Sequence, residues 1–229
     1  MKLRATTAML SATVLAFGCL MLTAGSPASA DEGVGDCHPG TFAGTIIVGG
    51  ALSENLVGGP GNDVIDGGGG NDTIDGGGGN DTIIGGTGDD VIDGGDGLDV
   101  IDGGEGLDQV AGGVCNDSVN GGKDNDTVNG DAGDDTVSGD GEADTVSGDA
   151  GNDTVNGNDG PDTLNGGDGP DTLNGADGAD VLNGDNGRDT LNGGNGVDSL
   201  TGGNGQDVGD GGPAVDAVCN YEPPLTNCP

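Results

Sequence analysis

The chain has 229 residues, among them 56 glycines, two Phe, one Tyr and no Trp, and its 41 acidic and four basic residues give a formal net charge of −37. So few large apolar side chains exclude an ordinary globular core, and so little positive charge excludes nucleic acid and anionic membranes as main partners. A multivalent cation is the counter-charge that this composition needs.

Residues 1–30 have the pattern of a secretory signal peptide. Lys2 and Arg4 form a short positive region, an apolar run follows, and an A-x-A cleavage site ends at Ala30. We therefore expect a secreted, extracellular protein that is cleaved after Ala30 and whose mature form does not insert into a membrane. Removing the two positive charges changes the net charge from −37 to −39.

Residues 31–57 are expected to form an N-terminal cap. The Thr-Ile-Ile-Val sequence at 45–48 is its best candidate for a strand. Residues 49–57 are a degenerate copy of the repeat that follows, with Glu54 and Leu56 at its acidic and aliphatic places. Atypical terminal units are expected in stacked repeats, because they cover exposed ends.

A nine-residue unit occurs seventeen times from residue 58 to residue 210, without insertion or deletion. Typical copies read GGPGNDVID, GGGGNDTID and GGDGPDTLN. The first place is always Gly, the sixth is always Asp, and the eighth is Ile, Val or Leu in every copy except the one with Gly209. This fixed period predicts one domain built as a stack of identical units, followed by a C-terminal cap and tail at 211–229.

Within each unit, the first six places are expected to form a Gly-rich loop and the last three a short strand. Side chains alternate between the faces of a strand, so the eighth place points inward and the seventh and ninth point outward. The inner residue is Ile from 65 to 101, Val from 110 to 155 and Leu from 164 to 200. Stacked neighbours would therefore usually meet a residue of their own kind.

The loop sequence Gly-Gly-x-Gly-x-Asp offers unhindered backbone carbonyl groups and one carboxylate. Calcium takes six to eight oxygen ligands of these kinds, whereas magnesium requires a rigid octahedron and keeps its waters. One loop supplies too few ligands, so we expect two loops to hold each calcium ion.

The copies GGPGNDVID and GGGGNDTID resemble the G-G-x-G-x-D-x-U-x nonapeptide of the RTX (repeats-in-toxin) family, the haemolysin-type calcium-binding repeats. The resemblance covers residues 58–210. It implies an all-β fold, a parallel β-roll or β-solenoid with two repeats per turn, in which calcium lies between loops two repeats apart.

The resemblance also implies that sixth-place aspartates and loop carbonyl groups hold calcium in two columns. One column would use Asp63, Asp81, Asp99, Asp117, Asp135, Asp153, Asp171, Asp189 and Asp207; the other would use Asp72, Asp90, Asp108, Asp126, Asp144, Asp162, Asp180 and Asp198. Glycines assigned to the first sites are Gly58, Gly61, Gly67, Gly70, Gly76 and Gly79. The gaps between loops accept at most about 15 ions, which would bring −39 to about −9, and the stack would be roughly 40 Å long.

Departures from the motif gather in the middle of the chain. Non-glycine residues at the fourth place are Cys115, Asp124 and Glu142; those at the second place are Asp131, Asp140, Asp149, Asn158, Ala176 and Asp185. A Cβ would strain a loop position with positive φ, so we expect weaker or absent sites, and the loosest segment, around 112–148. Alternatively, Asp124 and Glu142 donate extra carboxylates.

Four cysteines remain after the signal peptide: Cys37, Cys115, Cys219 and Cys228. An exported chain permits disulfides, and we expect a Cys219–Cys228 bridge. Cys37 and Cys115 either pair or remain free thiols. The spacing does not match a zinc site, and His38 is the single histidine.

The sequence thus predicts a secreted calcium-binding protein that folds when it binds calcium. An enzyme is not expected, because neither H-E-x-x-H nor G-x-S-x-G is present and His38 has no evident nucleophile partner. The alternative is an adhesin-like protein that recognises an extracellular surface, carbohydrate or ice. Its basis would be an outward row of Thr136, Thr154, Thr172 and Thr190, with Ser138, Asn156, Asn174 and Asn192 beside it.

Overall fold

A computed structural model describes residues 20–22, 43–212 and 218–220. Most of the predicted signal peptide therefore lies outside the described residues, as do residues 31–42 of the predicted N-terminal cap, with Cys37 and His38. Most of the predicted C-terminal cap and tail does so as well, with Cys228.

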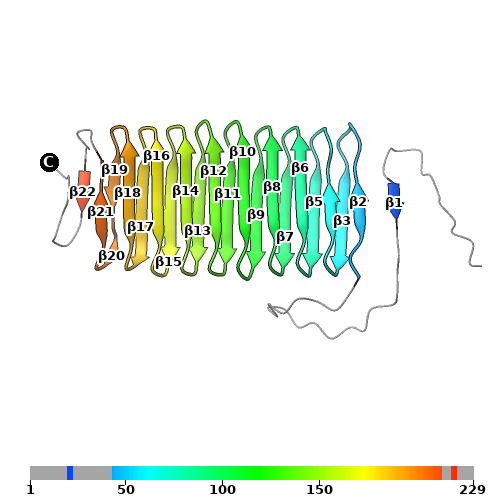
Figure 1. The fold of residues 1–229 in the computed structure, drawn as a ribbon, viewed down its shortest axis with the longest axis horizontal. Helices are drawn as coiled ribbons and strands as arrows, with labels where there is room; N and C mark the ends of the chain where they lie inside the picture. The colour runs from blue at the N-terminus through cyan, green and yellow to red at the C-terminus, as the bar shows by residue number, and fades with distance from the viewer. Residues whose placement is uncertain (1–19, 23–42, 213–217, 221–229) are drawn as a thin grey trace, which may run out of the picture.

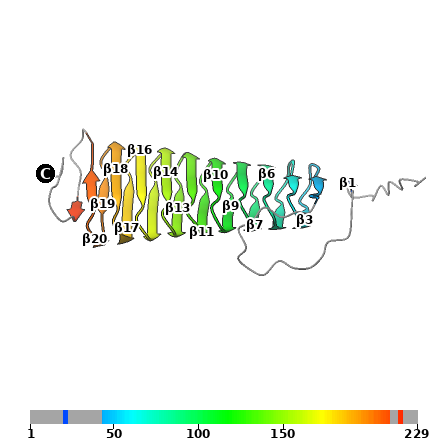
Figure 2. The same ribbon diagram turned by 60° about the horizontal axis from the view of Figure 1, so that its bottom comes forward.

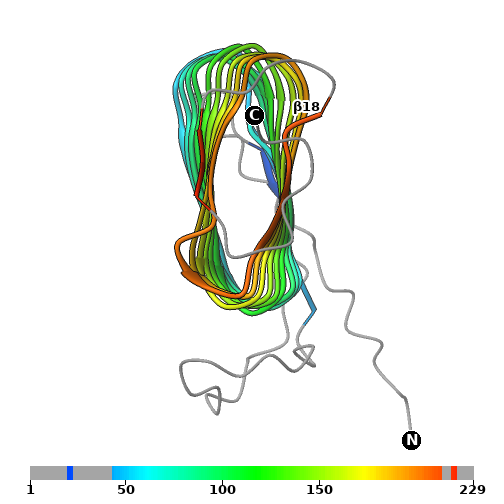
Figure 3. The ribbon, with the colours of Figure 1, turned by 90° about the vertical axis from the view of Figure 1, so that its left-hand side faces the viewer.

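The described chain is an all-β parallel solenoid of about 9 turns. Its strands lie side by side along the long axis (Figures 1 and 2), and the view along that axis shows two sheets that face each other across a flattened tube (Figure 3). The predicted parallel roll with two repeats per turn is confirmed. The described residues include no helix that could cross a membrane.

From β2 to β19, successive strands alternate between the two sheets. Sheet A contains β1 (Leu20–Leu22), β2 (Ile46–Val48), β4 (Val64–Asp66), β6 (Thr82–Thr87), β8 (Val100–Glu105), β10 (Ser118–Lys123), β12 (Thr136–Gly141), β14 (Thr154–Asp159), β16 (Thr172–Asp177), β18 (Thr190–Asn195) and β21 (Val208–Asp210). Sheet B contains β3 (Asn55–Pro60), β5 (Thr73–Gly78), β7 (Val91–Asp96), β9 (Gln109–Val114), β11 (Thr127–Ala132), β13 (Thr145–Ala150), β15 (Thr163–Asp168), β17 (Val181–Gly187), β19 (Ser199–Thr201) and β22 (Val218–Asn220), with β20 (Asn204–Gly205) beside β17. Neighbours inside the repeat region pair in parallel with a shift of 18 residues, as Thr136 does with Thr154.

The stack begins before the first regular repeat. The strand predicted at 45–48 is β2, which pairs with β4, and the degenerate copy at 49–57 joins sheet B through β3. On its other edge β2 pairs antiparallel with β1, a segment of the predicted signal peptide. At the opposite end β22 pairs with β19.

The prediction of three-residue strands was wrong, because most strands contain six residues. They cover the seventh, eighth and ninth places and then the first three places of the next copy, as in β5 and β6. The glycine at the second place has a positive φ, 95° in Gly77, yet Gly59 and Gly77 remain paired in the ladder. The glycines therefore continue the strand, and only three places remain for the turn.

The eighth-place side chains form the core, as predicted. From Ile65 to Leu200 they are almost fully buried, and so is Leu56 of the degenerate copy. Most ladder partners are of the same kind, for example Ile83 with Ile101 and Leu173 with Leu191. The first-place glycine is also buried in every repeat after the first, because it lies two residues further along the same face of the strand.

The seventh and ninth places face outward, as predicted. Thr136, Thr154, Thr172 and Thr190 are aligned along sheet A, and the Ser and Asn residues two positions later are aligned beside them. Sheet B carries a similar row, in which Thr127 pairs with Thr145 and Thr145 with Thr163.

Candidate metal-binding columns

Every sixth-place aspartate lies in the turn directly before a strand, and its side chain points into the roll. All seventeen are no more than 5% exposed. The 18-residue register stacks the turns, so the aspartates form two columns, one along each row of turns. The structure thus places all seventeen predicted carboxylates in the arrangement that the sequence implied.

One carboxylate oxygen of each aspartate is fixed by the neighbouring turn. The backbone N–H of Asp63 donates to Oδ1 of Asp81 at 2.7 Å, and Asp81 donates in the same way to Asp99 at 2.7 Å. Equivalent bonds run through both columns, to Asp207 in one and Asp198 in the other. This ladder holds the carboxylates in register, and the motif alone did not reveal it.

The second oxygen has no such partner. In the fifteen aspartates from Asp63 to Asp189, Oδ2 is buried and accepts no hydrogen bond from any described atom. A buried ionised oxygen without a donor or a counter-ion is costly. These atoms therefore require either a proton or a cation.

The invariant first-place glycine leaves the space into which Oδ2 points. A Cβ built on Gly76 would lie 2.7 Å from Oδ2 of Asp81 and 2.5 Å from the carbonyl oxygen of Gly94 in the next turn. No side chain fits there, so the small residue keeps a carboxylate oxygen and a carbonyl oxygen close together. Gly58 and Gly67, also predicted as ligands, have the same environment.

The fourth-place glycines lie at the tip of the turn. Gly79 has a φ of 109°, and a Cβ there would lie 2.6 Å from the backbone carbon of Gly61 in the preceding turn. Gly70 is similar, with a φ of 102°. These glycines, unlike the first-place ones, are needed for backbone conformation as well as for space.

The residues that depart from the repeat motif at the fourth place have strained backbones, but they do not interrupt the stack. Cys115, Asp124 and Glu142 have φ values of 89°, 75° and 75°. Nevertheless the aspartate ladder continues through 112–148 with bonds of 2.7 to 2.8 Å. Asp124 and Glu142 are exposed, so the structure does not bring them into the buried columns.

Burial raises the pKa values of the fifteen column aspartates from Asp63 to Asp189, and backbone hydrogen bonds lower them by less. The pKa rises to about 8 in Asp81 and Asp117. It rises to about 7 in Asp126, Asp135 and Asp171, and to about 6 in Asp99, Asp108, Asp144, Asp180 and Asp189. Neighbouring carboxylates of the same column add to the rise in Asp81 and Asp117.

The columns extend beyond the seventeen predicted aspartates. Glu54 has the sixth place of the degenerate copy, and its N–H donates to Oδ1 of Asp72 at 2.8 Å. Thr45 has the same place one turn earlier in the other column, and its N–H donates to Asp63. The sequence could have revealed the position of Thr45 in this column, because Thr45 precedes Asp63 by 18 residues, the length of one turn.

The donor set fits a hard cation bound by several loops. No group of three or more His, Cys, Asp or Glu side chains within the described ranges converges on a metal position. The turns from Asp63 to Asp189 instead each offer one carboxylate whose Oδ2 accepts no hydrogen bond, together with backbone carbonyl groups. Oxygen ligands of these two kinds are the ones calcium takes.

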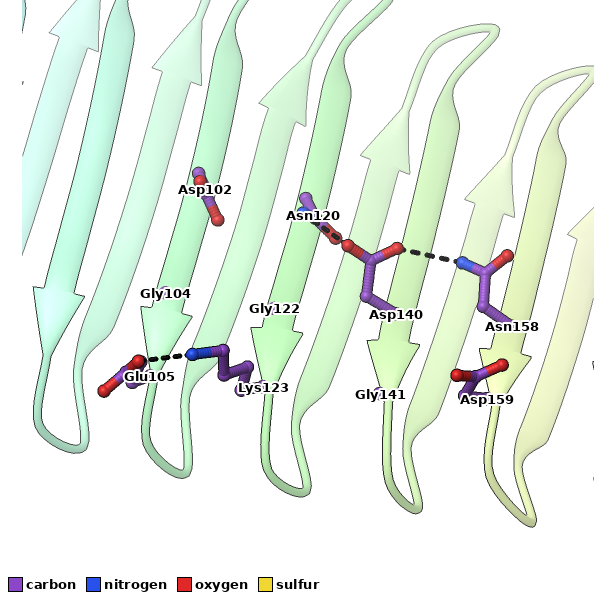
Figure 4. A pocket seen from close by; sticks show the side chains of 10 residues that line it. All are labelled: Asp102, Gly104, Glu105, Asn120, Gly122, Lys123, Asp140, Gly141, Asn158 and Asp159. Carbon is purple, nitrogen blue, oxygen red and sulfur yellow. Dashed lines mark hydrogen bonds and ion pairs between the residues drawn. The ribbon is translucent and has the colours of Figure 1, made fainter.

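A separate groove of about 630 Å³ crosses the outer face of sheet A (Figure 4). In it, Asp140 accepts hydrogen bonds from Asn120 and Asn158, each at 2.9 Å, and from Ser138 at 2.9 Å. Lys123 forms an ion pair with Glu105 at its edge. The network holds Asp140 in its left-handed conformation, with φ of 76°, and lies on the opposite face from the buried columns.

Cys115 takes part in a disulfide bond. The alternative of a free thiol at this position is therefore wrong. The predicted Cys219–Cys228 bridge is not tested, because Cys228 lies outside the described residues.

The profile of the family described as RTX calcium-binding nonapeptide repeat (4 copies) matches nine overlapping segments, from 48–83 at one end to 183–216 at the other. The chain belongs to the RTX calcium-binding repeat family. No curated protein matches the chain.

Proposed function

We propose that this chain is a secreted, non-catalytic calcium-binding protein whose roll folds when calcium ions bind between successive turns. The observation that carries the proposal is the pair of columns in which buried Oδ2 atoms have no hydrogen-bond partner. A cation between turns would supply the missing partner for each of them.

The same columns explain why folding would depend on calcium. Without a cation, stacking the turns buries carboxylates beside one another, which raises their pKa values instead of leaving them ionised. Among the described residues, the buried apolar core consists of the aliphatic side chains at the eighth places of the two sheets, with Ile47 and Leu56, and only these offset the cost. Binding energy therefore becomes folding energy, as in other metal-dependent domains.

The number of ions, the export of the chain and the lack of catalysis are parts of this proposal. At most about 15 ions fit the gaps between the predicted loops. The export part is supported by the signal-peptide pattern of residues 1–30, and the non-catalytic part by the absence of H-E-x-x-H and G-x-S-x-G.

Surface recognition is the weaker candidate. Aligned threonine rows occur on sheet A and on sheet B, so they do not mark one face as a binding surface. Threonine also suits exposed strands for its β-propensity alone.

The test is a calcium titration of the mature chain by calorimetry and circular dichroism, with a matched pair of variants. Asp99→Asn removes a buried charge whose Oδ2 has no hydrogen-bond partner, and Asp102→Asn removes a charge three residues away on the exposed face. We expect the wild type to gain β-structure with calcium and to lose it in EGTA. Asp99→Asn should bind one or two fewer ions and fold at a higher calcium concentration, while Asp102→Asn keeps the ion number.

β-structure that is unchanged by excess EGTA would contradict calcium-dependent folding. An equal loss of ions in both variants would show that the buried columns are not the sites.

A further inference from the structure

Asparagine is followed by glycine at a recurring place of the stack. Seven copies have Asn at the ninth place, and the first place of the next copy is always Gly; the asparagines are Asn120, Asn129, Asn156, Asn165, Asn174, Asn183 and Asn192. Asparagine is chemically labile, and most so before glycine, because no side chain hinders attack by the glycine nitrogen.

The reaction needs water and no enzyme. The glycine backbone nitrogen loses its proton and attacks Cγ of the preceding asparagine. The new C–N bond closes a five-membered succinimide ring, the bond to the side-chain nitrogen breaks, and that nitrogen leaves as ammonia with the proton. Water then opens one of the two ring carbonyl groups, which gives either ordinary aspartate or isoaspartate, whose backbone runs through the side chain and is one carbon longer.

The folded stack opposes this attack at the glycine. The first-place glycines that follow the seven asparagines are all buried. At the same place after Asp66, Gly67 donates its N–H to the carbonyl oxygen of Ile84 in the next turn at 2.8 Å, and Asn129 keeps the same 18-residue register with Ser147. In an extended strand, with ψ of about +115°, the glycine nitrogen also lies outside the plane in which the ring closes.

The asparagine side chains are held as well. Nδ2 of Asn174 donates to Oδ1 of Asn156 at 2.9 Å, and Nδ2 of Asn183 donates to Oδ1 of Asn165 at 3.0 Å. All seven are half-buried except Asn192, which is exposed. Attack therefore requires that a turn leaves the ladder.

Three further Asn–Gly pairs lie at the turns and provide a contrast within the same chain. They have the third and fourth places of their copies, and their asparagines, Asn186, Asn195 and Asn204, are all exposed. Asn204 and Gly205 are both exposed and form the two-residue strand β20 near the end of the stack, where repeat proteins open most easily.

We infer that the ninth-place Asn–Gly pairs are sites of spontaneous deamidation, which the folded roll blocks and the unfolded chain permits. An aspartate product fits the stack, because Asp66, Asp75, Asp93 and Asp102 already have this place. Isoaspartate does not fit, because its extra backbone carbon shifts the residues that follow out of the 18-residue register. The time that a chain spends unfolded thus limits its later ability to fold, and the inference rests on the proposed function only in that calcium sets this time.

Site-resolved mass spectrometry measures the reaction. The mature chain is incubated at neutral pH in saturating calcium, in EGTA, and in urea with EGTA, while circular dichroism reports whether it is folded. Asn129 and Asn165 should be converted in urea and at least about a hundredfold more slowly in the folded chain, because the rate follows the open fraction. Asn204 should be the least protected site in the folded chain.

Equal conversion of Asn129 and Asn165 in the folded chain and in urea, or no conversion in urea, overturns the inference. A chain that stays folded and protected in EGTA would instead contradict calcium-dependent folding and leave the comparison with urea standing.

The effect on folding is tested on wild-type chain that is aged in urea, returned to calcium and separated by size exclusion. Isoaspartate at the ninth places should be concentrated in the expanded fraction, whereas ordinary aspartate should occur in the compact fraction as well. An equal distribution of isoaspartate would contradict the effect on folding.

A variant with Ser at the seven ninth-place asparagines is the control, because Ser138 and Ser147 already have this place. Aged in the same way, it should recover more of its own starting β-structure than the wild type does. Equal fractional losses in the two proteins would show that the ninth-place asparagines do not limit refolding.

Discussion

At the scale of single residues, the first-place glycine and the sixth-place aspartate of each repeat depend on one another. The aspartate turns Oδ2 toward the glycine, and the missing side chain leaves room for that oxygen and for a carbonyl group of the next turn. Glycine is therefore required here for space, a different reason from the positive φ that requires it at the fourth place.

Gly76→Ala tests this dependence. The new methyl group would lie 2.5 Å from the carbonyl oxygen of Gly94 and 2.7 Å from Oδ2 of Asp81. We expect the free energy of unfolding of the calcium-loaded protein to fall by about 1 to 3 kcal/mol, as in other overpacked sites. Calcium affinity should fall with it, and urea unfolding and calcium titration measure the two effects.

Gly78→Ala is the matched control, because its Cβ would meet nothing closer than 3.9 Å. A change of less than about 0.5 kcal/mol is expected there. Equal effects at Gly76 and Gly78 would show that general glycine entropy, and not the space around Oδ2, explains the invariant first place.

At the scale of the strand, several copies carry a side chain where the second place has positive φ. At Asp140, hydrogen bonds from Asn120, Ser138 and Asn158 to the carboxylate offset the cost of the positive φ. Ala176 in β16 has a φ of 78° and no polar group with which to form such bonds. The strain of the positive φ at Ala176 is therefore not offset by hydrogen bonds of its side chain, and a glycine at this position should remove it.

Ala176→Gly should stabilise the calcium-loaded protein by about 0.5 to 1 kcal/mol, because glycine adopts this φ without a Cβ clash. Ala150→Gly, at the third place of β13 and outside the positive-φ set, should destabilise it by about 0.5 to 1 kcal/mol through lost backbone entropy. Urea unfolding in saturating calcium compares the two. Destabilisation by both variants would mean that the strain at Ala176 is negligible.

At the scale of the whole molecule, the two columns make the stability of the calcium-free roll depend on pH. The pKa values in the folded state reach about 6 to about 8, whereas an aspartate of the unfolded chain titrates near its ordinary pKa of 3.8. Between these values the folded state binds more protons, so stability is present at low pH and is lost as pH rises through the folded pKa values.

We therefore expect the calcium-free chain in EGTA to gain β-structure when the pH is lowered from 8 to 5, as followed by circular dichroism. Light scattering at each pH is the control for aggregation, because the isoelectric point is near 4.1. A loss of β-structure on acidification, with no scattering, would show that the columns are not protonated in a folded state.

The sequence by itself determined the repeat, the inward aliphatic place, the two columns and the family. These features are visible because a strict period repeats the same local choice of residue in every turn. Glu54 and Leu56 even marked the degenerate copy that joins the stack. The chemistry of the columns followed from the invariant Asp and its Gly-rich neighbours.

Only the tertiary structure decided the length of the strands, the different roles of Oδ1 and Oδ2, and the disulfide state of Cys115. Each of these depends on contacts between residues about 18 or more positions apart. The ladder between turns keeps the glycines in strands although their φ is positive, and the next turn selects which carboxylate oxygen is bonded. Such choices arise when the turns stack, so a single nine-residue unit does not contain them.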